Sequence, residues 1–388
     1  MKALHKIITA AVLVCSVHLA SAQETKIRFF GQPEITSSKI SENSEFVGVN
    51  EFGQYVKKDS TFTKTNFNTG NYVLFVTSQL SERISVLSEV SFDNSKNKFD
   101  FEVQRLMMRY YVKNYFSLRV GKMFTPIGYW NNQFTLGLVL QPTIQRPMAI
   151  RPVSDGGVLQ YRDAGVQIEG ENISSLRLFY KVLLGNGVGY YGSNDKGDNH
   201  VATTVQVGAE PVEGLKIIAS GMFDRIEKGK SNPNGSIAAL PDDGNLRLLV
   251  GSIAYMNPGS KFEFIGEYLT QQSAFNTAGT FNSNSYYAYA GYKLAEKLTP
   301  YVLYNSTQAG ESTTTGDPYF SPIPVKIQLF TIGLRYKLNS SFVGKVEYEI
   351  NDQKYFYQDI TMGGVKLDDG FTAQSKTSSL RLQLAFVF

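Results

Sequence analysis

The sequence has 388 residues, with 38 Lys and Arg against 34 Asp and Glu and a formal net charge of +4. A balance this small, without any Lys- or Arg-rich stretch, excludes a protein that tracks a phosphate backbone, so we expect no nucleic-acid partner. Aromatic residues reach 13%, and a chain rich in Tyr, Phe and Gly without long apolar runs is typical of an all-β fold.

Residues 1–22 have the pattern of a secretory signal. Lys2 and Lys6 form its charged start, an apolar core covers 7–19, and the small residues at 20–22 form an A-x-A cleavage pattern. We therefore predict an exported mature chain that begins at residue 23 and forms one domain, 23–388.

The mature chain has few residues suited to catalysis or metal binding. Cys15 is the only cysteine and lies in the predicted signal; a lipidated Cys15 is the weaker alternative, because Val14 precedes it where a small residue is expected. His200 is the one histidine beyond the signal, which excludes a multi-histidine zinc site. We predict no metal, no cofactor and no enzymatic activity. A barrel hydrolase built around His200 is the alternative.

No apolar run of about twenty residues follows the signal, so no transmembrane helix is predicted. Segments of alternating polarity, long enough to cross an apolar band of about 25 Å with tilt, recur instead. In chain order, the predicted strands are 27–40, 70–80, 83–94, 100–113, 115–122, 160–170, 174–184, 200–210, 213–225, 245–257, 259–272, 283–296, 297–308, 326–338, 341–351 and 376–388.

Tight and long connections alternate between these strands. Long connections are expected near 41–69, 95–99, 123–159, 185–199, 226–244, 273–282, 309–325 and 352–375. Short turns on one side and longer loops on the other predict a transmembrane antiparallel barrel of sixteen strands with both termini in the periplasm of a bacterial outer membrane. Within 41–69, the apolar residues 46–49 are either a further strand or part of the loop.

The segment 100–113 places basic side chains on its lumenal face. Arg105 and Arg109 alternate with Leu106, Met108 and Tyr110, which would face lipid, and Arg119 on the next strand could extend a basic strip.

The connection 123–159 is too apolar for a merely solvated loop. It contains the only Trp and four prolines, so we expect it to fold into the barrel and narrow it, with Arg146 and Arg151 projecting from it. The residues expected to build this constriction are Phe124, Pro126, Gly128 and Trp130.

The last nine residues, 380–388, have bulky apolar side chains at every even position. Such a strand, ending in the aromatic Phe388, resembles the C-terminal signature by which the barrel-assembly machinery recognises its substrates. The alternative is the last strand of a soluble sandwich.

The run Leu-Arg-Val-Gly-Lys-Met-Phe-Thr-Pro-Ile-Gly at 118–128 resembles the phosphate-selective porin O and P family, with Lys122 matching its V-G-K-x-x-T-P-x-G core. The resemblance implies a sixteen-stranded homotrimeric channel, narrowed by an inward-folded third loop, with lumenal Arg and Lys guiding anions. The inferred lumenal face mixes these cations with Glu, so a dense basic ladder for phosphate is not evident.

We therefore predict a passive porin in contact with outer-membrane lipid, for small hydrophilic solutes and with a mild preference for anions, including phosphate. The predicted anion-guiding residues are Arg105, Arg109, Arg119, Lys122, Arg146 and Arg151. An equally weighted alternative is that these cations pair with lumenal acids such as Glu89, Glu169, Glu263 or Glu267 and hold loop and wall together. A sugar channel with stacking tyrosines and a plugged structural or adhesive barrel are further alternatives.

Overall fold

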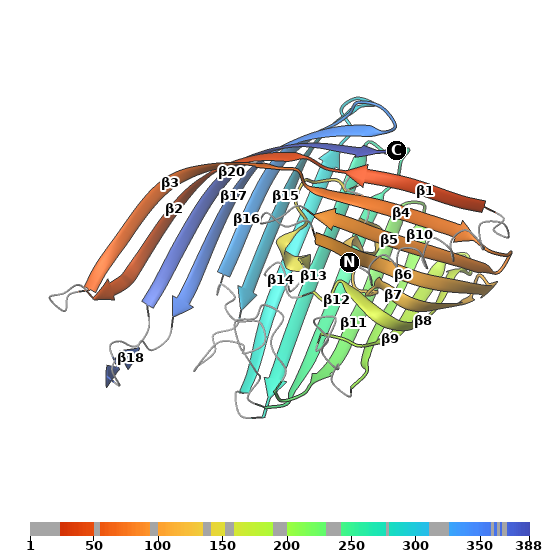
Figure 1. Ribbon diagram of the computed structural model, residues 1–388, viewed down its shortest axis with the longest axis horizontal. Coiled ribbons are helices and arrows are strands. Elements are labelled where there is room, and N and C mark those ends of the chain that lie inside the picture. The colour runs from red at the N-terminus through yellow and green to blue at the C-terminus, as the bar shows by residue number, and fades with distance from the viewer. Residues whose placement is uncertain are drawn as a thin grey trace, which may run out of the picture.

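Alternating segments of the chain form long antiparallel strands that close into a barrel (Figure 1). The computed structural model describes residues 24–49, 55–93, 100–134, 141–151, 159–188, 200–229, 242–276, 279–309, 326–357, 361–362, 365–366 and 371–388. The predicted signal at 1–22 lies outside these residues.

The strands among the described residues are β1 (Glu24–Gly31), β2 (Glu34–Val49), β3 (Tyr55–Asn68), β4 (Asn71–Gln79), β5 (Ile84–Asp93), β6 (Asp100–Lys113), β7 (Phe116–Phe124), β8 (Arg162–Ile173), β9 (Leu178–Gly185), β10 (Ala202–Val212), β11 (Leu215–Ile226), β12 (Gly244–Met256), β13 (Phe262–Phe275), β14 (Gly279–Tyr292), β15 (Leu298–Ala309), β16 (Lys326–Lys337), β17 (Phe342–Tyr357), the two-residue pair β18 (Thr361–Met362) and β19 (Val365–Lys366), and β20 (Phe371–Val387). The helical segments are α2 (Trp130–Gln133) and η1 (Met148–Ile150). No helix in the described part of the chain is long and apolar enough to cross a membrane.

The first two crossings of the barrel are each interrupted once. β1 continues into β2 across Gln32 and Pro33, and Pro33 lacks the N–H that a continuous ladder would use. β3 continues into β4 opposite this break, where Gly70 has φ +70° and packs against the Gln32 carbonyl. Counting each interrupted pair as one strand gives the closed barrel sixteen strands among the described residues, which confirms the predicted number.

The barrel closes through β20, the last strand. β20 pairs with β17 along one edge, and along its other edge with both β1 (Phe30 opposite Val387) and β2 (Glu34 opposite Gln383). The C-terminus accordingly lies beside β1 (Figure 1).

Inward and outward residues alternate as predicted. In β20, Leu380, Leu382 and Leu384 are exposed on the outer face, whereas Ser379 and Gln383 are buried inside. In β6, Leu106 and Met108 are likewise exposed outside, and Arg105 lies inside. The outer wall therefore presents the apolar band by which a transmembrane barrel contacts lipid.

Two of the predicted long connections are wrong. The stretch 41–69 belongs mostly to β2 and β3, and β13 and β14 leave only 276–278 between them instead of a loop at 273–282. Residues 46–49 end β2 and add no strand. In both places the strands continue beyond the apolar band with polar outward residues, as the hydrogen bonds between Ser41 and Thr61 and between Gln272 and Asn282 illustrate. Polarity alone does not distinguish such an extension from a loop.

Candidate functional site

The connection between β7 and β8 folds into the barrel, as predicted. We call its described residues, 125–134 and 141–151, the inner loop. Pro126, Gly128 and Trp130 are buried, and Trp130 is 0% exposed. Phe124 is the last residue of β7, immediately before the loop. It is the third connection on the rim with the long loops, after 50–54 and 94–99, so the predicted inward-folded third loop is confirmed.

An apolar core inside the barrel holds the inner loop against one side of the wall. Trp130 packs edge-on against Tyr287, with ring centroids 5.8 Å apart, and also contacts Phe134 at 5.0 Å. The wall residues of this core come from β10 to β15 and include Ala202, Ile218, Met222, Leu246, Leu248, Val250, Ile265, Leu269, Tyr287, Tyr289, Tyr301 and Leu303. Burial of this extent makes the loop part of the folded core.

The first half of the inner loop is also held through its backbone. Glu267 of β13 accepts hydrogen bonds from the N–H groups of Tyr129 and Trp130, the latter at 3.0 Å. Gly128 donates its N–H to Ser220 at 2.9 Å and accepts from the Gln206 amide at 2.9 Å. Three wall strands thus satisfy backbone groups that would otherwise be buried without partners.

The second half of the loop is held by the neighbouring strands β15 and β17. Glu347 of β17 accepts from the Ile144 N–H at 2.6 Å, and Asn305 of β15 accepts from the Met148 N–H at 3.0 Å. Lys345 donates to the Thr143 carbonyl at 3.2 Å.

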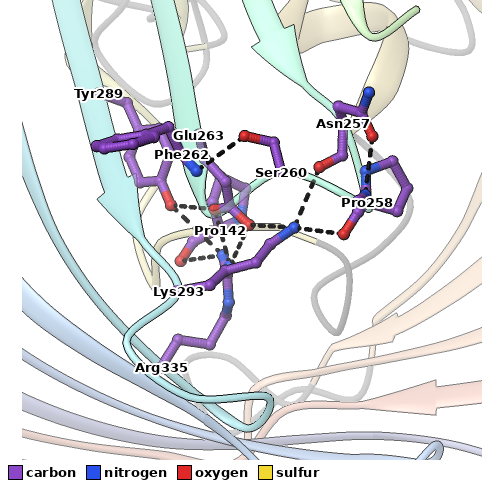
Figure 2. Close-up of polar contacts among 10 residues, drawn as sticks. Pro142, Asn257, Pro258, Ser260, Phe262, Glu263, Tyr289, Lys293 and Arg335 are labelled. Carbon is purple, nitrogen blue, oxygen red and sulfur yellow. Dashed lines mark hydrogen bonds and ion pairs between the residues drawn. The ribbon is translucent and has the colours of Figure 1, made fainter.

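Glu263 of β13 is the centre of a further cluster beside the loop (Figure 2). Both carboxylate oxygens accept from Arg335 Nη2, at 2.9 and 2.8 Å, and Tyr289 donates at 2.8 Å. Arg335 also donates to the Pro142 carbonyl of the inner loop at 3.4 Å. Lys293 Nζ lies 3.9 Å from Glu263 and donates to the carbonyls at the turn after β12. The cluster joins β13, β14, β16 and the loop.

The predicted lumenal arginines of β6 and β7 face inward, and each is paired with an acid. Arg105 is buried, 2.6 Å from Glu89, with its guanidinium 4.0 Å from the centroid of the Phe124 ring. Arg109 and Arg119 lie directly opposite each other and share Glu169, at 3.1 and 2.7 Å. The side chains of Arg109 and Arg119 remain 28% and 25% exposed, so these two can still meet a passing solute.

The other three predicted cations are placed differently. Arg146 is inside the loop and donates to Asn131 Oδ1 at 2.6 Å, and Arg151 Nε lies 3.5 Å from the Arg146 carbonyl oxygen. Lys122 lies directly opposite Leu106 in the β6–β7 register, next to the inward-facing Met123. The register therefore puts Lys122 on the outer side of the wall, which corrects the expectation that it lines the pore.

A cavity of about 380 Å³ lies along the wall opposite the apolar core. Four of its lining side chains are cationic and one is acidic; the lining residues are Glu24, Lys26, Thr77, Ser78, Gln79, Ser85, Val86, Leu87, Arg105, Met107, Arg109 and Arg119. Lys26 was missed in the sequence because the first strand was expected to begin at 27. Ile27 is exposed on the outer face, so the alternation of side chains along a strand would have predicted that Lys26 faces inward.

The tyrosines of β14 lie on both faces of the wall, and His200 lies outside the strands. Tyr286 is exposed on the outer face, whereas Tyr287 and Tyr289 point inward and are buried under the inner loop. Those two are therefore not available to stack a passing sugar ring. His200 lies just before β10, with Nε2 3.6 Å from Glu227.

This closed barrel with an inward-folded loop is the architecture of outer-membrane porins. The chain is similar to the anion-selective porin of Comamonas acidovorans, with a TM-score of 0.61 and 11% identity over 94% of this chain and 100% of that one. It is also similar to the outer-membrane protein OmpT of Vibrio cholerae (0.56, 14%, covering 94% and 98%) and to the outer membrane channel DcaP of Acinetobacter baumannii (0.54, 12%, covering 94% and 97%). At these identities the similarity establishes the fold. No family model and no curated sequence matches the chain.

Proposed function

We propose that the chain is an outer-membrane porin, a passive channel for small hydrophilic solutes with a mild preference for anions. The observation that carries the proposal is the cavity beside β1 and β4 to β7, where Lys26, Arg105, Arg109 and Arg119 outnumber the single acid Glu24. Fixed cations in a narrow pore lower the free energy of a permeating anion and raise that of a permeating cation.

The preference is mild because the lumenal cations are partly neutralised. Glu89 and Glu169 pair with three of the arginines, and Lys26 lies 2.9 Å from Glu24. The porin of Comamonas acidovorans is described as anion-selective, and the preference proposed for this chain has the same sign. Inorganic phosphate is one anion that such a lumen would admit, as the resemblance at 118–128 implies.

Arg28 adds to this proposal. Residues 26, 28 and 30 alternate with the outward residues of β1, and Phe30 is buried inside the barrel, so Arg28 faces the lumen next to Lys26. Among the described residues, Arg28 has no ion-pair partner. It is therefore a lumenal cation that no described carboxylate of the wall neutralises.

The measurement is the reversal potential of the purified protein in planar bilayers across a KCl gradient. We expect anion preference in the natural protein and a shift toward cations in Lys26→Glu with Arg28→Glu. The matched control is Lys39→Glu with Lys354→Glu, which changes the charge equally at exposed positions on the outer face of β2 and β17. Cation preference in the natural protein, or no conductance, would contradict the proposal.

Cellular placement follows the same proposal. We infer that residues 1–22 are removed on export, that both termini face the periplasm, and that the strand ending at Phe388 is recognised by the barrel-assembly machinery. We also propose a homotrimer; one structure of Vibrio cholerae OmpT is described as a trimer form. Cross-linking of the purified protein, followed by mass determination, tests the trimer.

A further inference from the structure

The outer face of four neighbouring strands changes from apolar to polar at a defined level. On β16, β17, β20 and β2, the last large apolar outward residues before the rim with the long loops are Phe330, Ile350, Leu380 and Ile35, and all four are exposed. Beyond them, the next outward positions are polar: Gln328, Asp352, Ser378 and Ser37. This edge marks where the hydrocarbon of a bilayer ends.

Each of these four strands carries a lysine four residues beyond its last apolar residue, on the same outer face. We call the set the lysine arc: Lys326, Lys354, Lys376 and Lys39. The strands on either side have Gln308 and Thr63 at the equivalent positions, four residues beyond Tyr304 and Phe67. The arc is therefore confined to four adjacent strands.

The depth of the arc matches lipid headgroups. Four residues of a strand span about 13 Å, and a tilt of about 40° reduces the height above the apolar edge to about 10 Å. The polar headgroup region is about 5–8 Å thick on each side, and a lysine stem can lie along the wall and bring its ammonium group down to that level.

The arc has a surplus of positive charge. Lys326 and Lys354 lie directly opposite each other, a like-charge pair that destabilises a sheet unless an anion lies between them. Asp352 faces the arc; it lies 3.8 Å from Lys376 and accepts from Gln374 at 2.6 Å. Among the described residues, Lys39, Lys326 and Lys354 have no ion-pair partner.

An apolar groove of about 640 Å³ lies on the same strands, further from the rim. Its outward lining includes Phe67, Tyr72, Leu334, Tyr336, Leu382 and Leu384, and Phe67 is 76% exposed. Gly344 forms part of its floor, where an added Cβ would have no neighbour closer than 4.0 Å. The break at Pro33 borders the groove.

We propose that this face binds one anionic lipid, with a phosphate on the lysine arc and an acyl chain in the groove. The lipid belongs to the leaflet next to the rim with the long loops. The proposal rests on the barrel's crossing a membrane and not on the solute it conducts, so conductance and lipid binding can fail independently.

Native mass spectrometry of the whole purified protein, released from detergent with equal amounts of phosphatidic acid and phosphatidylcholine, tests the proposal. We expect phosphatidic acid to be retained preferentially. Each lysine near an anionic lipid contributes roughly fivefold to binding, so Lys354→Gln alone lowers the preference by about that factor. The variant with all four arc lysines changed to Gln should lose the preference.

Two matched variants complete the test. Changing Lys113, Lys261, Lys297 and Lys337 to Gln removes equal charge at the rim with the short turns and should leave the preference intact. Gly344→Leu fills the groove and should reduce lipid retention. If the arc instead bound only inorganic phosphate, this substitution would have no effect on binding.

Three results would overturn the proposal. The first is equal retention of the two lipids by the natural protein. The second is unchanged retention by the variant lacking the arc. The third is displacement of the lipid by inorganic phosphate together with no effect of Gly344→Leu, which would assign the arc to free phosphate. A change in subunit number in the arc variant, with lipid retention unaltered, would instead make this face a contact between copies of the chain.

Discussion

The carboxylate of Glu267 accepts a hydrogen bond from the backbone N–H of Trp130 at 3.0 Å, although the two residues are 137 positions apart. The same oxygen also accepts from the N–H of Tyr129. One wall side chain therefore fixes the position at which the inner loop turns into α2.

Replacing Glu267 should release the first half of the inner loop. Glu267→Ala leaves two buried N–H groups without a partner, and each such group costs about 1–3 kcal/mol. We expect a lower unfolding midpoint in denaturant and larger current fluctuations in single-channel recordings. Glu267→Gln keeps one acceptor oxygen and should lie between the alanine variant and the natural protein. Quiet, unchanged currents in Glu267→Ala would show that the loop is held elsewhere.

Trp130 should be inaccessible to quenchers in the aqueous lumen and in the surrounding lipid. It is the only tryptophan of the chain and is fully buried between loop and wall, so the fluorescence of the folded protein reports this site alone. We expect neither aqueous iodide nor brominated lipid to quench it. The control is Phe67→Trp in a Trp130→Phe background, which brominated lipid should quench because Phe67 is exposed on the outer face. Iodide quenching of Trp130 would mean that the loop leaves the wall.

Gly128 is required by backbone conformation and by space. Its φ is +64°, and a Cβ there would lie 2.7 Å from the Glu267 carboxylate. The left-handed conformation costs other residues about 1–2 kcal/mol. The loss of stability in Gly128→Ala should exceed that amount, because the clash with Glu267 adds to the conformational cost. Gly279→Ala is the matched control for conformation alone, since Gly279 has φ +89° and open space around it. Equal losses in the two variants would remove the role of the contact with Glu267.

The pair formed by Glu263 and Arg335 should be strongly coupled. Removing one partner of a buried ion pair costs about 3–5 kcal/mol because the other charge stays buried. We expect Glu263→Gln with Arg335→Gln to destabilise the protein by clearly less than the sum of the single variants, as measured by denaturant unfolding followed through Trp130. Additive losses would indicate that Lys293 and the Pro142 carbonyl compensate each partner separately.

The barrel itself could be predicted from the sequence because its signal is local. Alternation along 380–388 requires only neighbouring residues, and the structure confirms it. Pro33 was a local signal as well; it marks the break between β1 and β2 but lay unused inside the predicted strand 27–40. Polar strand extensions such as 41–49 could not be separated from loops, since both are rich in polar residues.

The candidate site was harder to predict because its partners are distant in sequence. Inward-facing Arg105 was predicted, but its neutralisation by Glu89 depends on a register that shifts at Glu89. Burial of Tyr287 depends on where Trp130 comes to lie. The sequence alone therefore does not decide whether these cations guide anions or hold the loop. The structure adds specific ion pairs to the second alternative and leaves Arg109 and Arg119 partly exposed for the first.

The apolar core on β10 to β15 fills one side of the barrel and leaves the open space on the other side. Solutes would pass beside β1 and β4 to β7 and not along the barrel axis, because the opposite sector is filled by the inner loop. A residue's angular position around the barrel, more than its depth, then decides what its replacement disturbs. We expect inward substitutions in the filled sector to act first on the folding of the inner loop, and those in the open sector to act on conduction without loss of stability. A mutational scan around one cross-section would divide into these two classes at the borders of the loop.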